Sequence, residues 1–306
     1  MASLPGFHTA SRHTRSPGPP MNVLSIQSAV AYGHVGNAAA QPALHRLGHT
    51  VWRVDTVVFS NHPGHGKFAG QVRPAAEVGT ILQGLADLGV QHDCAAVLSG
   101  YLGEAGTASA VAEAVTQVKQ ASPQAVYLLD PVMGDAGRVY VRDGVPLALA
   151  GTLLPLADIV APNAFELSLL ADRPVNDMAT ALAAARVLLA RSVGLGPGLG
   201  PSLVLATGLR LGDKVATLAV SHAAAHAVTA PWIDRPIFGT GDLFGALFLG
   251  HWLEAPGDAV RALRLAASGM AEAVAATDAA QASELALIAN LERICHPSTL
   301  LPAAQV

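Results

Sequence analysis

From Met21 onward, short apolar runs alternate with longer segments of helical periodicity, and no other feature of the chain constrains its fold as strongly. Apolar runs without polar interruption are typical of strands that are buried on both faces, because helices cover the sheet from two sides. The alternation therefore predicts an α/β fold, with a mainly parallel central sheet flanked by helices on both faces. In sheets of this kind, ligands bind beyond the carboxyl ends of the strands.

The individual elements follow the same rule along the chain. We expect strands over residues 23–26, 50–59, 94–98, 125–129, 158–161, 202–206 and 215–220. We expect helices over 36–47, in spite of Pro42, and over 76–88, 105–121, 145–156, 178–190, 242–253, 257–276 and 281–294. The glycine-rich stretch over 194–201 lacks the strand-then-helix context of a dinucleotide fingerprint, and it is predicted to be a loop.

One domain is expected to account for most of the chain. Residues 1–20 include Arg12 and Arg15 but no acid, and they lack the apolar region of a secretory signal. We therefore expect a disordered N-terminal extension over 1–20, with a transit peptide as the alternative. The single domain is expected over 21–295, followed by a C-terminal tail over 296–306.

Composition excludes several classes of protein. The formal net charge is −4 and there is no basic stripe, so a nucleic-acid partner is not expected. The chain is 51% hydrophobic, yet no stretch of 18 apolar residues is free of Pro, Asp, Arg or clustered Gly, so no membrane span is expected. Cys94 and Cys295 stand far apart and fit neither a disulfide framework nor a metal cluster, which is typical of a protein of the reducing cytoplasm.

The motif Gly239-Thr240-Gly241-Asp242 directly precedes an apolar helical run. The first turn of such a helix presents unpaired N–H groups and the positive end of the helix dipole, which together favour a phosphate. An aspartate at the same place is able to take a proton from an alcohol. The motif thus indicates the anion cradle and the base of a phosphoryl transfer, although a glycine turn with an aspartate cap is the structural alternative.

Acidic and amide side chains follow two predicted strands. Asp130 and Asp135 stand at the exit of one strand, where carboxylates are well placed to hold a hydrated Mg²⁺. A turn in which Asp135 bonds the local backbone is the alternative. Asn163 and Glu166 follow the next strand and have the spacing of a helix capping box, but they are also suited to hold metal-bound waters or a nucleotide phosphate.

Three further strand ends offer groups that suit a small flat ring. Ser28 supplies one hydrogen-bonding hydroxyl and Val35 an apolar contact, whereas His34 is interpreted as a structural loop residue. Tyr101 follows a glycine, so that its ring is able to stack on an aromatic ligand, or simply to pack on a neighbouring helix. The segment that ends in His62 and Pro63 stands at the third of these ends.

These segments together resemble the pyridoxal kinase family, within the ribokinase-like superfamily. The Gly-Thr-Gly-Asp and Asp-Pro-Val-Met-Gly motifs are shared with related kinases, whereas the Ser-Gly-Tyr and Phe-Ser-Asn-His segments are similar to the pyridoxal branch in particular. The resemblance covers nearly the whole chain beyond Met21. It runs in order through residues 25–28, 32–37, 59–62, 98–101, 130–135, 157–166 and 239–244.

The resemblance implies a ribokinase-like three-layer sandwich and a homodimeric, MgATP-dependent enzyme that phosphorylates the 5′-hydroxyl of pyridoxal and its vitamers, with a monovalent cation as a further candidate cofactor. It implies that Asp242 is the base, and that Gly239, Thr240 and Gly241 form the anion hole. Ser28, Val35, His62, Pro63 and Tyr101 would contact the vitamer. Asp130, Asn163, Glu166, Thr207 and Phe238 would contact the nucleotide, and Asp130, Asp135 and Glu166 the metal.

Two positions depart from the family pattern. Pro63 stands where a threonine is usual, which removes a hydroxyl and an N–H from the vitamer side. Ala161 stands where some members have a threonine next to the phosphates, and we expect it to tune nucleotide affinity. A sibling kinase that acts on hydroxymethylpyrimidine or another small alcohol, and a B6-vitamer carrier without catalytic activity, remain the alternative functions.

Overall fold

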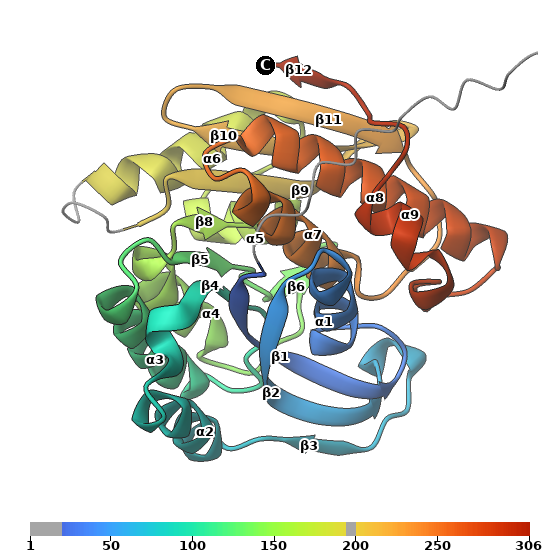
Figure 1. Ribbon diagram of the computed structural model, residues 1–306. Coiled ribbons are helices and arrows are strands. Elements are labelled where there is room, and N and C mark those ends of the chain that lie inside the picture. The colour runs from blue at the N-terminus through green and yellow to red at the C-terminus, as the bar shows by residue number, and fades with distance from the viewer. Residues whose placement is uncertain (1–19, 194–199) are drawn as a thin grey trace, which may run out of the picture.

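The computed structural model describes residues 20–193 and 200–306. A ten-stranded sheet lies at its centre and helices pack on both faces (Figure 1). From one edge to the other, its strands are β12 (Ala303–Gln305), β11 (Ala225–Pro231), β10 (Lys214–Ser221), β9 (Leu203–Leu211), β8 (Ile159–Val160), β5 (Val126–Leu129), β4 (Cys94–Ser99), β1 (Asn22–Tyr32), β2 (Thr50–Asn61) and β3 (Gly70–Val72). The strands from β9 to β2 pair in parallel, and the pairs at both edges are antiparallel.

Two hydrophobic cores lie on the two faces of the sheet, which is why the strands read as continuous apolar runs. In β5, Leu128 belongs to one core and Leu129 to the other, and both are fully buried. One core is covered by α2 (Ala75–Asp87), α3 (Thr107–Ala121), α4 (Val145–Ala148), α5 (Ala164–Ala171) and α6 (Met178–Val193). The other is covered by α1 (Asn37–Arg46), α7 (Thr240–Glu254), α8 (Ala259–Ala279) and α9 (Leu291–Cys295).

The predicted α/β class and most of the predicted elements are confirmed, including the helix that contains Pro42. The strand predicted over 23–26 is too short, because β1 continues past a register shift between Gln27 and Ala29 and pairs with β2 as far as Tyr32. The single helix predicted over 145–156 is wrong as well. Only its first turn is α4, which is followed by a π-helical turn (Leu149–Leu153) and a 3₁₀ turn (Leu154–Leu156) that contains Pro155.

The third closing helix was predicted over 281–294, but helix begins only with a 3₁₀ turn at Ile288–Asn290 and continues as α9. Gln281 has a left-handed φ of 51°, and the backbone of residues 283 and 284 bonds that of Phe238 instead of forming helix. The sequence also gave no signal for β3, β11, β12 or the separate hairpin of β6 (Gly134–Asp135) and β7 (Arg138–Val139).

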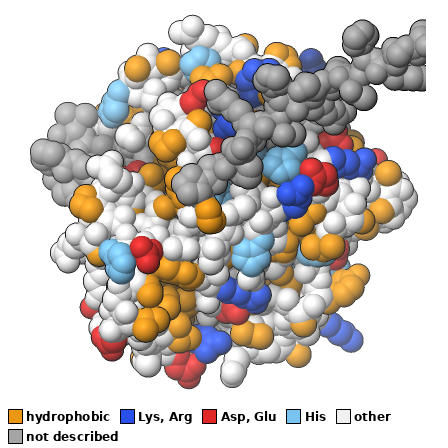
Figure 2. Space-filling view, in the orientation of Figure 1, with side chains coloured by type: hydrophobic (Ala, Val, Ile, Leu, Met, Phe, Trp, Pro, Cys, Tyr) orange, Lys and Arg blue, Asp and Glu red, His pale blue; other side chains and the backbone are white. Residues whose placement is uncertain are grey.

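Part of the segment expected as a C-terminal tail forms β12, which extends the sheet beyond β11. The extension predicted over 1–20, apart from Pro20, and most of the loop predicted over 194–201 lie outside the described residues. In the described part of the chain, no helix combines the length and the apolar character that crossing a membrane requires. Figure 2 shows one face of the molecule, on which basic and acidic side chains are interspersed among apolar ones.

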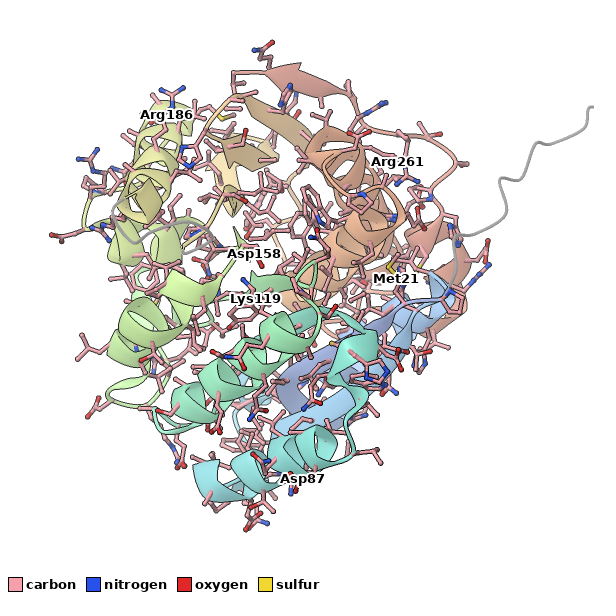
Figure 3. All side chains as sticks on the ribbon, turned by 60° about the vertical axis from the view of Figure 1, so that its left-hand side comes forward. Met21, Asp87, Lys119, Asp158, Arg186 and Arg261 are labelled. Carbon is pink, nitrogen blue, oxygen red and sulfur yellow. The ribbon has the colours of Figure 1, made fainter. Side chains whose placement is uncertain are left out.

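A partly exposed ion pair joins α3 to the start of β8. Lys119 of α3 and Asp158, directly before β8, lie next to each other (Figure 3), with Nζ 2.9 Å from Oδ2. Asp158 Oδ2 also accepts the N–H of Tyr127 at 2.7 Å. The pair therefore aligns β5 with β8, and these strands end next to Asp130 and Asn163.

Candidate active site

A cavity of about 1100 Å³ opens at the carboxyl ends of the parallel strands. Its lining comes from the strands β1, β2 and β9, from the loops after β1, β2, β4, β5 and β8, and from the start of α7. All of the site residues predicted from the sequence line this one cavity. They are Ser28, Val35, His62, Pro63, Tyr101, Asp130, Asp135, Asn163, Glu166, Thr207, Phe238, Gly239, Thr240, Gly241 and Asp242.

The glycine turn before α7 presents backbone amides to the cavity. Gly239 has a left-handed φ of 83°, and a Cβ there would overlap the carbonyl oxygen of His34, so a glycine is required. The first bond of α7 is donated by Leu243 to the Gly239 carbonyl, which leaves the N–H groups of Thr240 and Gly241 without a partner in the helix ladder. These amides and the helix dipole are able to bind an anion.

Asp242 lies in the first turn of α7 and is partly buried in the cavity wall. Burial raises the pKa of its carboxyl, while the N–H groups of Gly36 and of Asp242 itself bond the carboxylate and oppose the shift. Gly36 also lies against Ser28, since a Cβ at Gly36 would overlap the Ser28 hydroxyl and carbonyl. Gly36 of the β1–α1 loop thus contacts both Ser28 and Asp242.

Asp130 and Glu166 place two more carboxyl groups beside Asp242. Burial, followed by the charges of Glu166 and Asp242, raises the pKa of Asp130 well above its usual range. Burial also raises the pKa of Glu166 to about 7, although the amides of Met133 and Asn163 bond its two oxygens at 2.9 Å each. Carboxylates that raise each other's pKa form a site that favours a cation.

The donor set fits Mg²⁺ bound mainly through water and phosphate. In residues 20–193 and 200–306, no group of three or more His, Cys, Asp or Glu side chains is arranged to hold a metal by itself. Both Glu166 oxygens already accept amide N–H groups, whereas no hydrogen bond to the Asp130 carboxylate occurs within the described chain. Because Mg²⁺ takes only one or two protein carboxylates, Asp130 is the ligand available to it.

The capping-box interpretation of Asn163 and Glu166 is confirmed, and their role towards metal-bound waters or a phosphate stays a prediction. Asn163 Oδ1 accepts the N–H of Glu166, and Glu166 Oε2 accepts the N–H of Asn163, each at 2.9 Å, so the predicted capping box is present. Both side chains also line the cavity. Thr207 lies beside Asn163, to which its backbone is joined by a parallel bridge. Asp135 is exposed and accepts the N–H of Ala136 at 2.7 Å, which agrees with the alternative that it bonds the local backbone.

Aromatic and apolar groups line the end of the cavity nearest to Ser28. His62 stacks on Phe238, with ring centroids 4.2 Å apart, and burial lowers the pKa of this histidine. Pro63 begins a 3₁₀ turn (Pro63–His65) that is capped by His62 Nδ1, which accepts the N–H of Gly64 at 3.1 Å. A proline suits this position because the first N–H of a helical turn has no partner to lose.

Sequence reasoning missed several other lining residues. Arg138 of β7 and Tyr140, directly after it, line the cavity, and the segment after β11 contributes Trp232 and Arg235. Neither group stands in a motif, and only the fold brings them to the cavity. An apolar wall comes from β10, β11 and α8 through Val215, Thr217, Val228, Ala230, Ala267, Met270, Ala271, Val274 and Ala275, which give no signal beyond ordinary core periodicity.

Comparison with known proteins places this chain among kinases. The sequence model of the phosphomethylpyrimidine kinase family matches residues 72–284. A curated pyridoxal kinase of Rubrobacter xylanophilus is 43% identical over 297 residues, which cover 95% of this chain and 99% of that protein. A curated pyridoxal kinase of Deinococcus radiodurans is 44% identical over 294 residues, which cover 95% of this chain and 98% of that protein.

The fold is also that of a solved kinase. The structure of pyridoxal kinase from Leishmania donovani in complex with ADP and pyridoxine matches with a TM-score of 0.85 and 29% sequence identity. The match covers 93% of this chain and 99% of that chain.

Proposed function

The chain belongs to the pyridoxal kinase family and has the ribokinase-like fold, and we propose that it transfers the γ-phosphoryl group of ATP to the 5′-hydroxyl of pyridoxal. The observation that carries this proposal is the position of Asp242. Its carboxylate lies in the same cavity as the amides of the α7 turn and as Ser28, Val35 and Tyr101. A base, an anion cradle and a pocket for a small ring therefore share one site.

The protein's part in the reaction is to position groups and to stabilise charge. Phosphoryl transfer passes through a loose transition state, so a strong base is not required. Asp242 would accept the proton of the 5′-hydroxyl as the new bond to phosphorus forms, and its raised pKa makes it a better base than an exposed aspartate. The amides of Thr240 and Gly241 would stabilise the charge on the transferred group.

A divalent cation completes the proposed site. Asp130 would hold Mg²⁺, directly or through water, and Glu166 would bond its water shell. Bound there, the ion supplies charge neutralisation between the nucleotide phosphates. Asn163 and Thr207 would contact the phosphates, and the apolar wall of β10, β11 and α8 would accept the base of the nucleotide.

The pyridine ring would occupy the end of the cavity near Ser28. Ser28 would bond the ring nitrogen, with Val35 and Tyr101 on the two sides of the ring and the turn of His62 and Pro63 over it. The match to the phosphomethylpyrimidine kinase model keeps hydroxymethylpyrimidine as a second candidate substrate. Assays with pyridoxal, pyridoxine, pyridoxamine and hydroxymethylpyrimidine separate the two, and ATP consumption separates an enzyme from a carrier.

Replacing Asp242 with asparagine tests the proposal. Asp242→Asn keeps the size of the side chain and removes the base, so kcat should fall by about 10²–10⁴ with little change in the KM for pyridoxal. Asp258→Asn is the matched control, because Asp258 caps α8 away from the cavity by accepting the N–H of Arg261 and asparagine is an equally good cap. Near-wild-type turnover in Asp242→Asn would reject Asp242 as the base.

We also propose that the enzyme acts as a homodimer in the cytoplasm. The two cysteines support a reducing compartment, since Cys94 and Cys295 are both buried and free. Sedimentation equilibrium measures the oligomeric state directly, and a monomer at assay concentration would exclude the dimer.

A further inference from the structure

We propose that Glu284 is a positioning residue, which holds two loops of the vitamer pocket in place by binding both with one carboxylate. The inference rests on the proposed function, because it assigns a role in the binding of the same substrate. Glu284 lies after α8, in the segment expected to be helix, and nothing in its sequence context marks it as a site residue.

Both oxygens of Glu284 have a partner from a distant loop. Oε2 accepts the N–H of His34 at 3.1 Å, and Oε1 lies 2.6 Å from Nε2 of His65. The Glu284 side chain is only 12% exposed, and its bond to the N–H of His34 is partly buried, whereas His65 reaches it from the surface of the molecule. Gly33 makes the arrangement possible, because its φ is 96° and a Cβ there would overlap the Glu284 carboxylate.

Through His34, Glu284 is connected to the part of the pocket that contains Asp242. His34 precedes Val35 and Gly36, and the N–H of Gly36 bonds the Asp242 carboxylate. The carbonyl of His34 lies against Gly239, the residue that opens α7. A shift of His34 would therefore change the position of Val35 against the ring and of Gly36 against Asp242.

Through His65, Glu284 is connected to the 3₁₀ turn of Pro63–His65. His65 is the last residue of the turn that begins at Pro63. Phe238 stacks on His62 and meets the ring of His65 edge-on, with centroids 5.1 Å apart. The backbone of Phe238 is in turn bridged to Glu284. His65, Phe238 and Glu284 thus form a closed set of contacts, which we name the Glu284 clamp.

The clamp contacts the vitamer side of the cavity, and Phe238, which the resemblance assigned to the nucleotide, stacks on His62 there. The proposed nucleotide groups Asp130, Asn163 and Thr207 are held by separate bonds to the backbone around β4, β6 and β8. Loss of the clamp should therefore weaken pyridoxal binding and leave ATP binding unchanged. A merely structural residue would lower both affinities together, or lower the stability of the whole protein.

The test compares Glu284→Gln and His65→Ala with Glu272→Gln in the full-length enzyme. Glu272 is a matched control, since it pairs with Arg293 at 3.7 Å and does not line the cavity. We expect Glu284→Gln to raise the KM for pyridoxal roughly ten- to a hundredfold, as for loss of a charge-assisted hydrogen bond, with the KM for ATP unchanged. The double variant Glu284→Gln/His65→Ala should be no worse than the more impaired single variant.

Three results would overturn the proposal. They are an unchanged KM for pyridoxal, an equal rise in both KM values, and additive effects in the double variant. If Glu284→Gln does not fold, two other variants take its place. His65→Ala removes the partner of Oε1, and Gly33→Ala displaces the Glu284 carboxylate. For both, the KM for pyridoxal is expected to rise while the KM for ATP stays unchanged. Failure of the proposed function is a separate result, because the wild-type protein itself would then not phosphorylate pyridoxal.

Discussion

Substitution of Gly239 by alanine separates backbone strain from damage to the anion cradle. The residue has φ 83° and ψ 8°, a left-handed conformation that costs a residue with a Cβ about 1–2 kcal/mol. The new Cβ would also overlap the carbonyl oxygen of His34, so the two backbones must move apart by about 1 Å. Misplacement of that size at the start of α7 should lower kcat by about 10²–10³.

Gly89 provides a control with the same strain and no overlap. It has φ 76° and ψ 19°, and a Cβ there would have no atom within 4 Å. Thermal unfolding should show both variants destabilised, with Tm lower by about 2–4 °C for Gly89→Ala. A coupled assay of pyridoxal phosphorylation should show full turnover in Gly89→Ala and the large loss only in Gly239→Ala. Equal turnover in the two variants would refute the assignment of the α7 turn as the anion cradle.

Three further expectations concern single residues. Pro63→Thr should tighten pyridoxal binding by about 0.5–1.5 kcal/mol, the net contribution of one hydrogen bond, and calorimetry without a gain would contradict it. Asn163→Ala removes the cap of α5 and should lower the unfolding free energy by about 0.5–2 kcal/mol in urea titrations. Burial alone would raise the pKa of Glu254, but His251 and Arg261 lower it to about 2. The stabilisation by this carboxylate is therefore complete above its unfolded pKa of about 4.5 and is lost as the pH falls towards 2, so the stability difference between wild type and Glu254→Gln should shrink in acid.

The sequence was sufficient to predict those elements whose burial produces a recognisable pattern of apolar residues. Strands with both faces buried, such as β5, read as apolar runs because Leu128 and Leu129 face different cores. Parallel strands end at the same edge of a sheet, so groups that follow them meet in one place. For that reason Asp130 and Asn163, which are separated widely along the chain, were predicted together and line one cavity, whereas Thr207, which lines the same cavity, was predicted only from the resemblance.

The sequence was insufficient where a tertiary contact decides the local structure. Residues 281–287 have helical periodicity, but the bridge between Phe238 and Glu284 draws this backbone away from a helix. β12 pairs through only three residues and has no partner within its own segment. Val274 and Met270 read as ordinary core residues of α8, and only the position of the helix beside β11 turns them towards the cavity.

The capping box of α5 shows why a structural and a functional interpretation of the same residues need not compete. The bonds between Asn163 and Glu166 start the helix. They also fix the orientation of both side chains at the cavity wall. The N–H of Met133 donates a hydrogen bond to the other oxygen of Glu166. Of this pair of acids, Asp130 is therefore the one whose carboxylate accepts no hydrogen bond within the described chain. Glu166 is hydrogen-bonded to the backbone and Asp130 is not, so a hydrated cation is favoured at Asp130. Glu166 is then able to orient the water shell of the ion.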